Sequence, residues 1–153
     1  MRHPVQRWLM KTEPGTFSID DLAARRTEPW DGVRNYQARN FIRTMHRGDA
    51  VLIYHSACAQ PGVAGLAKVA SPPKPDPTQF DPRSDHYDAA SKRADPRWTL
   101  VDVRFVRRLR RVITLDEIKS LRGLGDFALT RRGNRLSVLP VTDKQWDAIL
   151  ALE

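Results

Sequence analysis

Residues 30–40 are the most informative stretch of the chain and read Trp30-Asp31-Gly32-Val33-Arg34-Asn35-Tyr36-Gln37-Ala38-Arg39-Asn40. Trp30 follows a proline between two predicted helices, where no helical core face requires a large aromatic side chain. Asn35 directly precedes an apolar helical pattern, so it suits an N-cap. Its amide, with a paired donor and acceptor, equally suits reading the edge of a heterocycle beside the Trp30 indole. Both roles of Asn35 stay open.

An apolar helix and a buried strand are predicted after this stretch. In residues 36–46 the apolar side chains recur at helical spacing, at Ala38, Phe41, Ile42 and Met45. This spacing is typical of the buried face of a helix, and it leaves Arg39 and Arg43 on the opposite face. Ala50–His55 follows and is apolar on both faces, as a central strand would be.

Strands alternate with short helices over the rest of the chain. Alternating or continuous apolar patterns predict strands at residues 7–12, 62–70, 101–113 and 136–141. Helix starts are indicated by Ser18 as an N-cap before residues 19–24, and by two capping boxes, Thr114 with Glu117 and Thr142 with Gln145. Gly62 and Gly65 fall inside a strand pattern, which indicates a bulge or a close backbone approach.

A proline-dense section, residues 72–98, separates two parts of this pattern. It is either a linker between two small domains or an ordered excursion within one. Neither flank has enough apolar material for a core of its own, which favours the excursion. The sequence therefore predicts one α+β domain over residues 1–153, built on a strongly curved or barrel-like sheet of about five to six strands edged by short helices.

The charge of the chain points to an anionic partner. Its 153 residues carry 26 Lys and Arg against 18 Asp and Glu, a formal charge of +8. Ten basic and four acidic residues fall between 99 and 135, so the excess is concentrated. No run approaches the ~20 apolar residues of a membrane span, and no signal-type segment is visible. We expect a cytoplasmic protein, nucleoid-associated in a bacterium, with no membrane partner.

The sequence contains few candidate catalytic motifs or residues. Dinucleotide, P-loop, zincin and nucleophile-elbow motifs are missing from the sequence. Cys58 is the single cysteine, and the aspartates of the proline-dense section do not have calcium-loop spacing, so we expect no metal and no cofactor. His55 and Cys58 are the only nucleophile or base candidates. We favour the interpretation that His55 orients a neighbouring group by a hydrogen bond and that Cys58 only packs. The sequence predicts a protein that is not an enzyme.

A second loop tryptophan, Trp98, ends the proline-dense section. Two loop tryptophans can sandwich a flat ring, and stacking on aromatic side chains contributes ~1–3 kcal/mol per base. Trp8 lies in a strand pattern and Trp146 on an amphipathic helix face, so both are predicted to belong to the core.

Several blocks together resemble the EVE domain family. They are Trp8-Leu9-Met10-Lys11-Thr12-Glu13-Pro14, Phe17-Ser18, the stretch 30–40, Gly48-Asp49, Tyr54-His55-Ser56, Pro61-Gly62-Val63-Ala64-Gly65, Pro75-Asp76-Pro77-Thr78-Gln79-Phe80-Asp81, Pro96-Arg97-Trp98, Val101-Asp102-Val103 and Leu136-Ser137-Val138-Leu139-Pro140-Val141. The resemblance runs from about residue 7 to residue 151. It implies a PUA-like fold, related to the YTH readers of methylated adenine, and makes the proline-dense section part of the domain.

The resemblance also implies a function. EVE domains are similar to non-catalytic readers that hold a modified base, notably a modified cytosine in DNA, in an aromatic pocket. Two alternatives are kept: a YTH-like reader of a modified base in RNA, and an enzyme that acts on a nucleobase or small anion through His55. We expect a nucleic-acid partner, DNA rather than RNA, and a monomer.

Site residues follow from the matching positions. Trp30 and Trp98 would flank the extruded base. Hydrogen bonds to its edge would come from Asn35, Ser18 and the backbone around Lys11 and Thr12, with His55 beside them and Tyr87 at the rim. Independently of the resemblance, the basic segments suggest which residues would hold the phosphates. They are Arg34, Arg39 and Arg43 in and before the helix at 36–46, and basic residues of segments 104–111 and 131–135, namely Arg107, Arg110 and Arg135.

Overall fold

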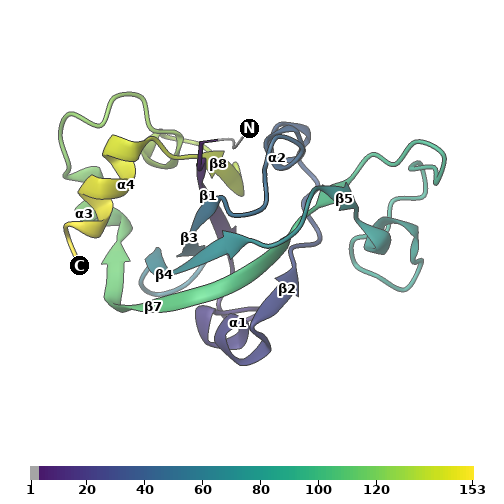
Figure 1. Cartoon of the computed structure of the whole chain (residues 1–153), viewed down its shortest axis with the longest axis horizontal. Helices are drawn as coiled ribbons and strands as arrows, with labels where there is room; N and C mark the ends of the chain where they lie inside the picture. Colours follow the sequence, from purple (N-terminus) through teal and green to yellow (C-terminus); the bar gives the residue numbers. More distant parts are fainter. Residues whose placement is uncertain (1–3) are drawn as a thin grey trace.

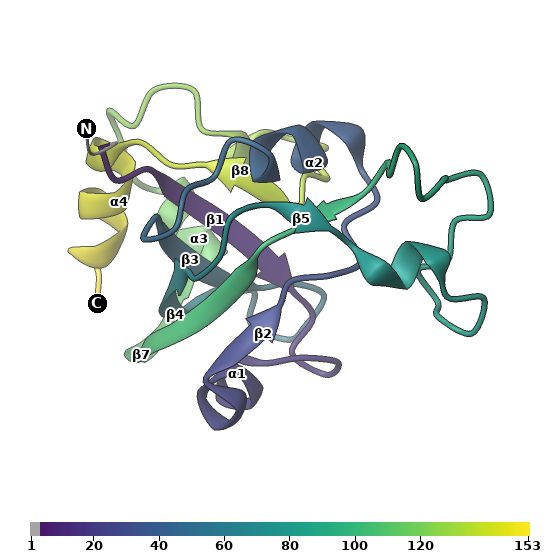
Figure 2. The same ribbon diagram turned by 45° about the vertical axis from the view of Figure 1, so that its right-hand side comes forward.

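A mixed six-stranded sheet forms the centre of the molecule, seen in a computed structural model that describes residues 4–153 (Figure 1). Its strands are β1 (Arg7–Thr12), β2 (Thr27–Pro29), β3 (Ala50–His55), β4 (Gly62–Val69), β7 (Asp102–Thr114) and β8 (Val138–Pro140). Their order is β2-β7-β4-β3-β1-β8, with β1 parallel to β3 and every other pair antiparallel. The sheet curls into a half-barrel, which Figure 2 shows from a second side and which confirms the predicted fold class.

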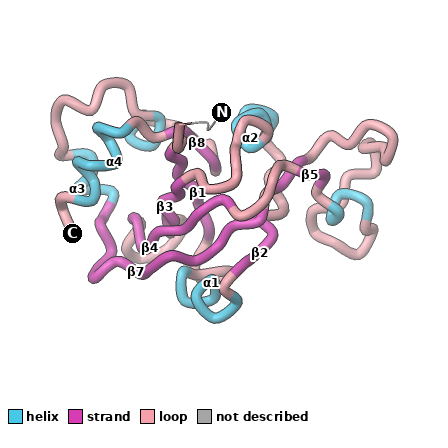
Figure 3. The backbone as a smooth tube through the Cα atoms, viewed as in Figure 1, coloured by secondary structure: helices cyan, strands magenta, loops and turns pink. Residues whose placement is uncertain are grey.

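Short helices and a small ribbon surround the sheet (Figure 3). The helices are α1 (Ile19–Arg25), α2 (Tyr36–Ile42), α3 (Leu115–Lys119) and α4 (Asp143–Leu150), with 3₁₀ turns η1 (Pro77–Phe80) and η2 (Ala128–Thr130). The Ser18 N-cap and both predicted capping boxes are present. A further pair, β5 (Lys74–Pro75) with β6 (Thr99–Leu100), and strand β2 were not predicted, because two or three residues are too few to show a period. Among the described residues, no helix is long and apolar enough to cross a membrane.

Both faces of the sheet are buried. Along β1, Met10 joins a core cluster that includes α1 and α2, whereas Leu9 joins a second cluster that includes α3 and α4. The same alternation sends Ile53 of β3 to the first cluster and Leu52 to the second. This double burial explains why these strands are apolar on both faces. The predicted core tryptophans, Trp8 and Trp146, are buried as expected.

Helix α2 is shorter than the predicted span of 36–46. It ends at Ile42, after which the N–H groups of Thr44 and Met45 donate to carbonyls three residues back rather than four. The Thr44 hydroxyl also donates to the Phe41 carbonyl, at 2.7 Å, and competes with helix continuation. Met45 is nevertheless buried. The regular spacing of apolar residues up to Met45 therefore indicates which side chains are buried, and the helix itself ends earlier.

The strand glycines allow close packing and a bulge, as predicted. A Cβ on Gly62 would lie 2.2 Å from the Ile113 carbonyl oxygen, and one on Gly65 would lie 2.4 Å from the Ile19 side chain. The register between β4 and β7 shifts between Val63 and Gly65. Bulges of this kind increase strand twist and so contribute to the curvature of the sheet.

The proline-dense section is an ordered excursion that folds on itself around Gln79. The Gln79 amide is fully buried. Its Nε2 donates to the carbonyls of Asp76 (2.7 Å) and Trp98 (2.9 Å), and its Oε1 accepts from the Ser91 hydroxyl (2.6 Å) and the Trp98 N–H (3.1 Å). Every donor and acceptor of the side chain is thus used. These bonds join the two ends of residues 72–98, which is not the behaviour of a linker.

Candidate base-binding site

A cavity of about 370 Å³ opens where β1 ends, beside β2 and the loop that follows it. Its lining combines aromatic faces, two carboxylates and cationic groups, from Lys11, Thr12, Thr16, Phe17, Arg25, Glu28, Pro29, Trp30, Asp31 and His86. A volume of this size is within the range of small-molecule sites. Of the predicted pocket residues, the structure brings Lys11, Thr12 and Trp30 together here.

Trp30 and Phe17 form the aromatic wall of this cavity. Their rings meet edge to face, with centroids 6.0 Å apart and planes at 84°. The backbone N–H of Trp30 donates to the carbonyl of Val101, the residue before β7, at 2.9 Å, and the hydroxyl of Thr12 in β1 donates to the Phe17 carbonyl at 2.7 Å. The backbones that carry both rings are therefore fixed to residues in or next to the strands. Phe17 was not predicted as a site residue, although it lies in one of the family-like blocks.

Ionisable groups on the cavity wall are partly desolvated. Burial lowers the pKa of Lys11, whose Nζ lies 5.8 Å from the centroid of the Tyr54 ring. Burial raises the pKa of Glu28, which Arg25 opposes through an ion pair of 3.2 Å. Burial also raises the pKa of Asp31, and the nearby Asp76 carboxylate adds to that rise. The cavity thus offers both hydrogen-bond donors and acceptors to a ring.

Trp98 does not line this cavity, so the predicted tryptophan sandwich is absent. Its indole stacks on Tyr36, with centroids 4.9 Å apart and planes at 24°, and the Arg34 guanidinium lies 5.4 Å from its centroid. Its Nε1 donates to Asp88 at 2.7 Å. Through these contacts Trp98 packs the excursion of residues 72–98 against α2. Tyr87 is exposed and also lies outside the cavity lining, whereas its neighbour His86 is part of it.

Asn35 and Ser18 act as helix caps. The Asn35 Oδ1 accepts from the Ala38 N–H at 2.9 Å, and the Ser18 Oγ accepts from the Asp21 N–H at 3.2 Å. Neither lines the cavity beside Trp30, because each side chain turns into the first turn of its own helix. Asn35 instead borders a second cavity of about 360 Å³, shared with Gln37 and residues 131–136. The N-cap interpretation of Asn35 is confirmed.

His55 connects β3 to α1 instead of lining the cavity. Its Nε2 accepts a hydrogen bond from the Ile19 N–H at 3.1 Å. Burial lowers the pKa of His55, with the Asp20 carboxylate opposing the shift. A neutral imidazole is required to accept this bond. The favoured interpretation, a histidine that orients a neighbour, is confirmed. Cys58 is a half-buried free thiol.

The His55 contact predicts a pH-dependent stability. Because the folded-state pKa lies below the value of 6.5 for the free side chain, the unfolded chain binds more protons in mildly acidic solution. The contribution is complete above about pH 6.5 and falls as pH drops toward the folded-state pKa. Denaturant unfolding between pH 5 and 8 should show this fall in the wild type. His55→Gln should show a shallower one, and identical slopes would contradict the assignment.

The buried Asp76 carboxylate holds the far wall of the cavity in place. It accepts from the Gly32 N–H (2.8 Å), the Arg34 Nη1 (3.0 Å) and the Thr78 hydroxyl (2.6 Å). Burial alone would raise the pKa of Asp76, but these bonds outweigh it and hold the pKa below its usual value. Gly32 has φ +82°, and a Cβ there would lie 2.5 Å from the His86 ring. Asp76 therefore fixes the glycine turn against which His86 packs.

Most of the predicted phosphate ligands are already bound to protein groups. Arg34 also donates to the His86 carbonyl, at 2.8 and 3.0 Å. Arg39 donates to the Arg97 carbonyl at 3.0 Å, and Arg43 to the Thr99 hydroxyl at 3.0 Å. Arg107 forms two bonds to Glu153, at 2.8 and 2.9 Å. These four guanidinium groups hydrogen-bond to protein groups in this structure, and their role as phosphate ligands stays a prediction.

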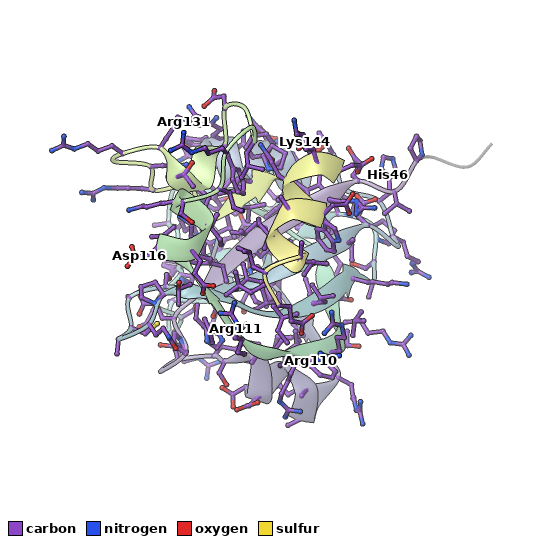
Figure 4. All side chains as sticks on the ribbon, turned by 90° about the vertical axis from the view of Figure 1, so that its left-hand side faces the viewer. His46, Arg110, Arg111, Asp116, Arg131 and Lys144 are labelled. Atoms are coloured by element: carbon purple, nitrogen blue, oxygen red, sulfur yellow. The ribbon has the colours of Figure 1, made fainter. Side chains whose placement is uncertain are left out.

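Exposed basic side chains also border two further cavities near the cavity beside Trp30, and of these Arg131 is paired with Asp126 at 3.2 Å. Lys11 also lines a third cavity, of about 790 Å³, which runs past Tyr54 and Lys119 to residues 129–134. Residues 131–134 border the second cavity as well, together with Arg135. Figure 4 shows Arg131 on the loop above α3 and α4, with Arg110 and Arg111 at the opposite edge on β7. The described residues contain no group of three His, Cys, Asp or Glu that could hold a metal ion.

Sequence comparison identifies the class of protein to which this curled sheet and its cavity belong. The EVE domain family matches residues 6–152, and the chain is a member of that family. Among curated proteins it is similar to thymocyte nuclear protein 1 of Homo sapiens, with 45% identity over 95% of this chain and 73% of that protein. The Mus musculus protein is 46% identical over the same shares.

Two solved structures are similar over nearly their whole length. A Pseudomonas syringae protein superposes with a TM-score of 0.93 at 48% identity, covering 95% of this chain and 98% of that one. The human THYN1 protein, in a crystal structure in complex with 5-methylcytosine-containing DNA, superposes with a TM-score of 0.91 at 44% identity, covering 96% of each chain.

Proposed function

We propose that this protein is a non-catalytic reader that holds a modified cytosine of DNA in the cavity beside Trp30. The observation that carries the proposal is its similarity to the human protein bound to 5-methylcytosine-containing DNA, over 96% of this chain. The cavity supports it with an aromatic wall, Trp30 and Phe17, next to donors and acceptors for the edge of a ring. The engaged imidazole of His55 argues against the alternative of catalysis through that residue.

Base extrusion makes phosphate contacts necessary. Unstacking a base from a duplex costs a few kcal/mol, comparable to the ~1–3 kcal/mol that stacking on an aromatic wall returns. The net affinity must then come largely from charge. We assign the phosphate contacts to the exposed side chains of Arg132, Arg135 and Lys119. Arg132 and Lys119 line the same cavity as Lys11 of the base site, and Arg135 lines the neighbouring one.

Charge reversal on this loop is expected to weaken binding without changing base preference. Arg132→Glu with Arg135→Glu should lower the affinity for every oligonucleotide alike and reduce the salt slope by about 2, since each phosphate contact contributes roughly one counterion. Fluorescence anisotropy over a salt series measures both. Arg104→Glu with Arg110→Glu is the matched control, with the same change of charge on exposed positions of β7. Equal losses in the two variants would contradict the assignment to the 131–135 loop.

The function is tested with matched oligonucleotides. One DNA sequence carrying cytosine or 5-methylcytosine at a single position, and the corresponding RNA pair, should be titrated as single strands and duplexes. We expect tighter binding to modified DNA than to its three counterparts. A preference for modified RNA would favour the YTH-like alternative, through its 2′-hydroxyl. Recovery of a chemically altered oligonucleotide would contradict the non-catalytic role. The cytoplasmic location and the monomeric state stay predictions.

A further inference from the structure

A site for 5-methylcytosine must also reject thymine. Both pyrimidines carry the same methyl group at C5, so an aromatic wall that senses only that group binds them alike. They differ at position 4, where cytosine presents an amino donor and thymine a carbonyl acceptor. Rejection of thymine therefore requires a fixed hydrogen-bond acceptor in the cavity that faces this position.

Two carboxylates line the cavity, and only one of them forms an ion pair with a neighbouring side chain. Glu28 is paired with Arg25 at 3.2 Å, and its side chain is 18% exposed. Asp31 makes no ion pair with the other described residues, and its side chain receives no hydrogen bond from another residue among them. Its backbone is fixed by an N–H bond to the Pro29 carbonyl, at 3.0 Å, directly after Trp30. Asp31 is thus the unpaired carboxylate beside the aromatic wall.

The hydroxyl groups in the cavity are weaker candidates. The Thr16 hydroxyl can rotate to donate or accept, so it does not distinguish an amino group from a carbonyl. The Thr12 hydroxyl proton already donates to Phe17, which leaves a neutral acceptor. Hydrogen bonds to an ionised acceptor are about twice as strong as those to a neutral one. The Lys11 ammonium, a donor only, complements a ring that also has acceptors.

We propose that Asp31 is the specificity-determining residue that distinguishes modified cytosine from thymine, by accepting a hydrogen bond from the 4-amino group. This proposal rests on the proposed function and deepens it. Thymine would bring its 4-carbonyl oxygen against the carboxylate, leaving two desolvated acceptors without a proton between them. Discrimination of roughly 10- to 100-fold is expected from one such contact.

The test compares Asp31→Asn with a matched control outside the cavity, Asp81→Asn. Both variants exchange a carboxylate for an amide of the same size, and the amide can present either a donor or an acceptor. Single-stranded oligonucleotides that differ only in one base, 5-methylcytosine, cytosine or thymine, remove base-pairing differences from the comparison. Wild type should prefer 5-methylcytosine over thymine by roughly 10- to 100-fold. Asp31→Asn should reduce this ratio to within about threefold, and Asp81→Asn should preserve it.

A base analogue isolates the contact itself. 5-Methylpyrimidin-2-one lacks the 4-amino group, so an oligonucleotide with this base in place of 5-methylcytosine should bind wild type more weakly. The loss should be smaller for Asp31→Asn, because a neutral amide oxygen accepts a weaker hydrogen bond than a carboxylate. If wild type prefers 5-methylcytosine over cytosine but Asp31→Asn keeps the wild-type ratio against thymine, this inference is overturned and the reader function stands. If wild type does not prefer 5-methylcytosine over cytosine, both are overturned. Because the Asp31 side chain makes no ion pair and receives no hydrogen bond from the other described residues, its substitution should leave the melting temperature nearly unchanged.

Discussion

Trp30→Leu is expected to abolish the preference for modified over plain cytosine, while weak, salt-sensitive binding to DNA remains. Loss of one stacking partner corresponds to about 1–3 kcal/mol, a 5- to 150-fold loss of affinity for the modified oligonucleotide. Trp30 is also only 8% exposed and belongs to the core. Leucine keeps part of the apolar volume and so costs less than the ~3–5 kcal/mol of truncation to alanine. Anisotropy at a temperature well below the melting point measures the preference.

Trp98→Leu is the control that separates stacking on the base from support of the fold. Trp98 is 5% exposed, like Trp30, but contacts Tyr36 and Asp88 outside the cavity. The Trp98→Leu variant should lose about as much folding stability as Trp30→Leu and should retain the preference for modified cytosine. If Trp98→Leu lost the preference and Trp30→Leu kept it, the cavity would have been assigned to the wrong tryptophan.

Asp76→Asn is expected to have the largest effect on stability. Its carboxylate is fully buried and paired with Arg34, and removal of one partner from a buried pair typically costs about 3–5 kcal/mol. The proline-dense section should become more accessible to protease, since Asp76 connects it to the loop of Gly32. Denaturant unfolding measures the first effect and limited proteolysis the second. Asp81→Asn, which removes an exposed pair with Arg83, should cost under about 1 kcal/mol.

The same carboxylate gives a pH signature in acid. The pKa of folded Asp76 lies below the value of 3.8 for the free side chain, so its contribution is complete above about pH 3.8 and is lost as pH falls below it. Asp76→Asn should remove this part of the acid destabilisation. An equal loss of stability in acid for wild type and variant would show that other groups carry it.

Local patterns were sufficient for five of the six strands of the sheet and for the helix starts. Period and capping depend on neighbours within a few residues, so strands such as β3 and caps such as Thr114 and Thr142 were predicted correctly. The same locality explains the shorter helix α2, because the apolar spacing through Met45 reflects burial and does not depend on helix continuation.

Contacts between distant segments could not be predicted. Trp98 and Tyr36 are far apart in sequence, so nothing local to Trp98 indicated that its ring is covered. Arg107 is likewise paired across 46 positions with Glu153, and Arg34 across 42 with Asp76. Net charge indicates an anionic partner but does not reveal which arginines are already paired. Phe17 and Asp31 both lie in quoted blocks, and only the curl of the sheet, which brings residues of β1 and β2 to one cavity, places them together.

The central claim is that a modified cytosine ring lies against Trp30 and Phe17, and it can be tested by a single solution measurement. An oligonucleotide with a ¹³C-labelled methyl group on its 5-methylcytosine should be titrated with the protein and followed by NMR. We expect a ring-current shift of the methyl resonance on binding and nuclear Overhauser contacts to the indole of Trp30 and the ring of Phe17. Binding without that shift, or with contacts to Tyr36 and Trp98 instead, would contradict the account.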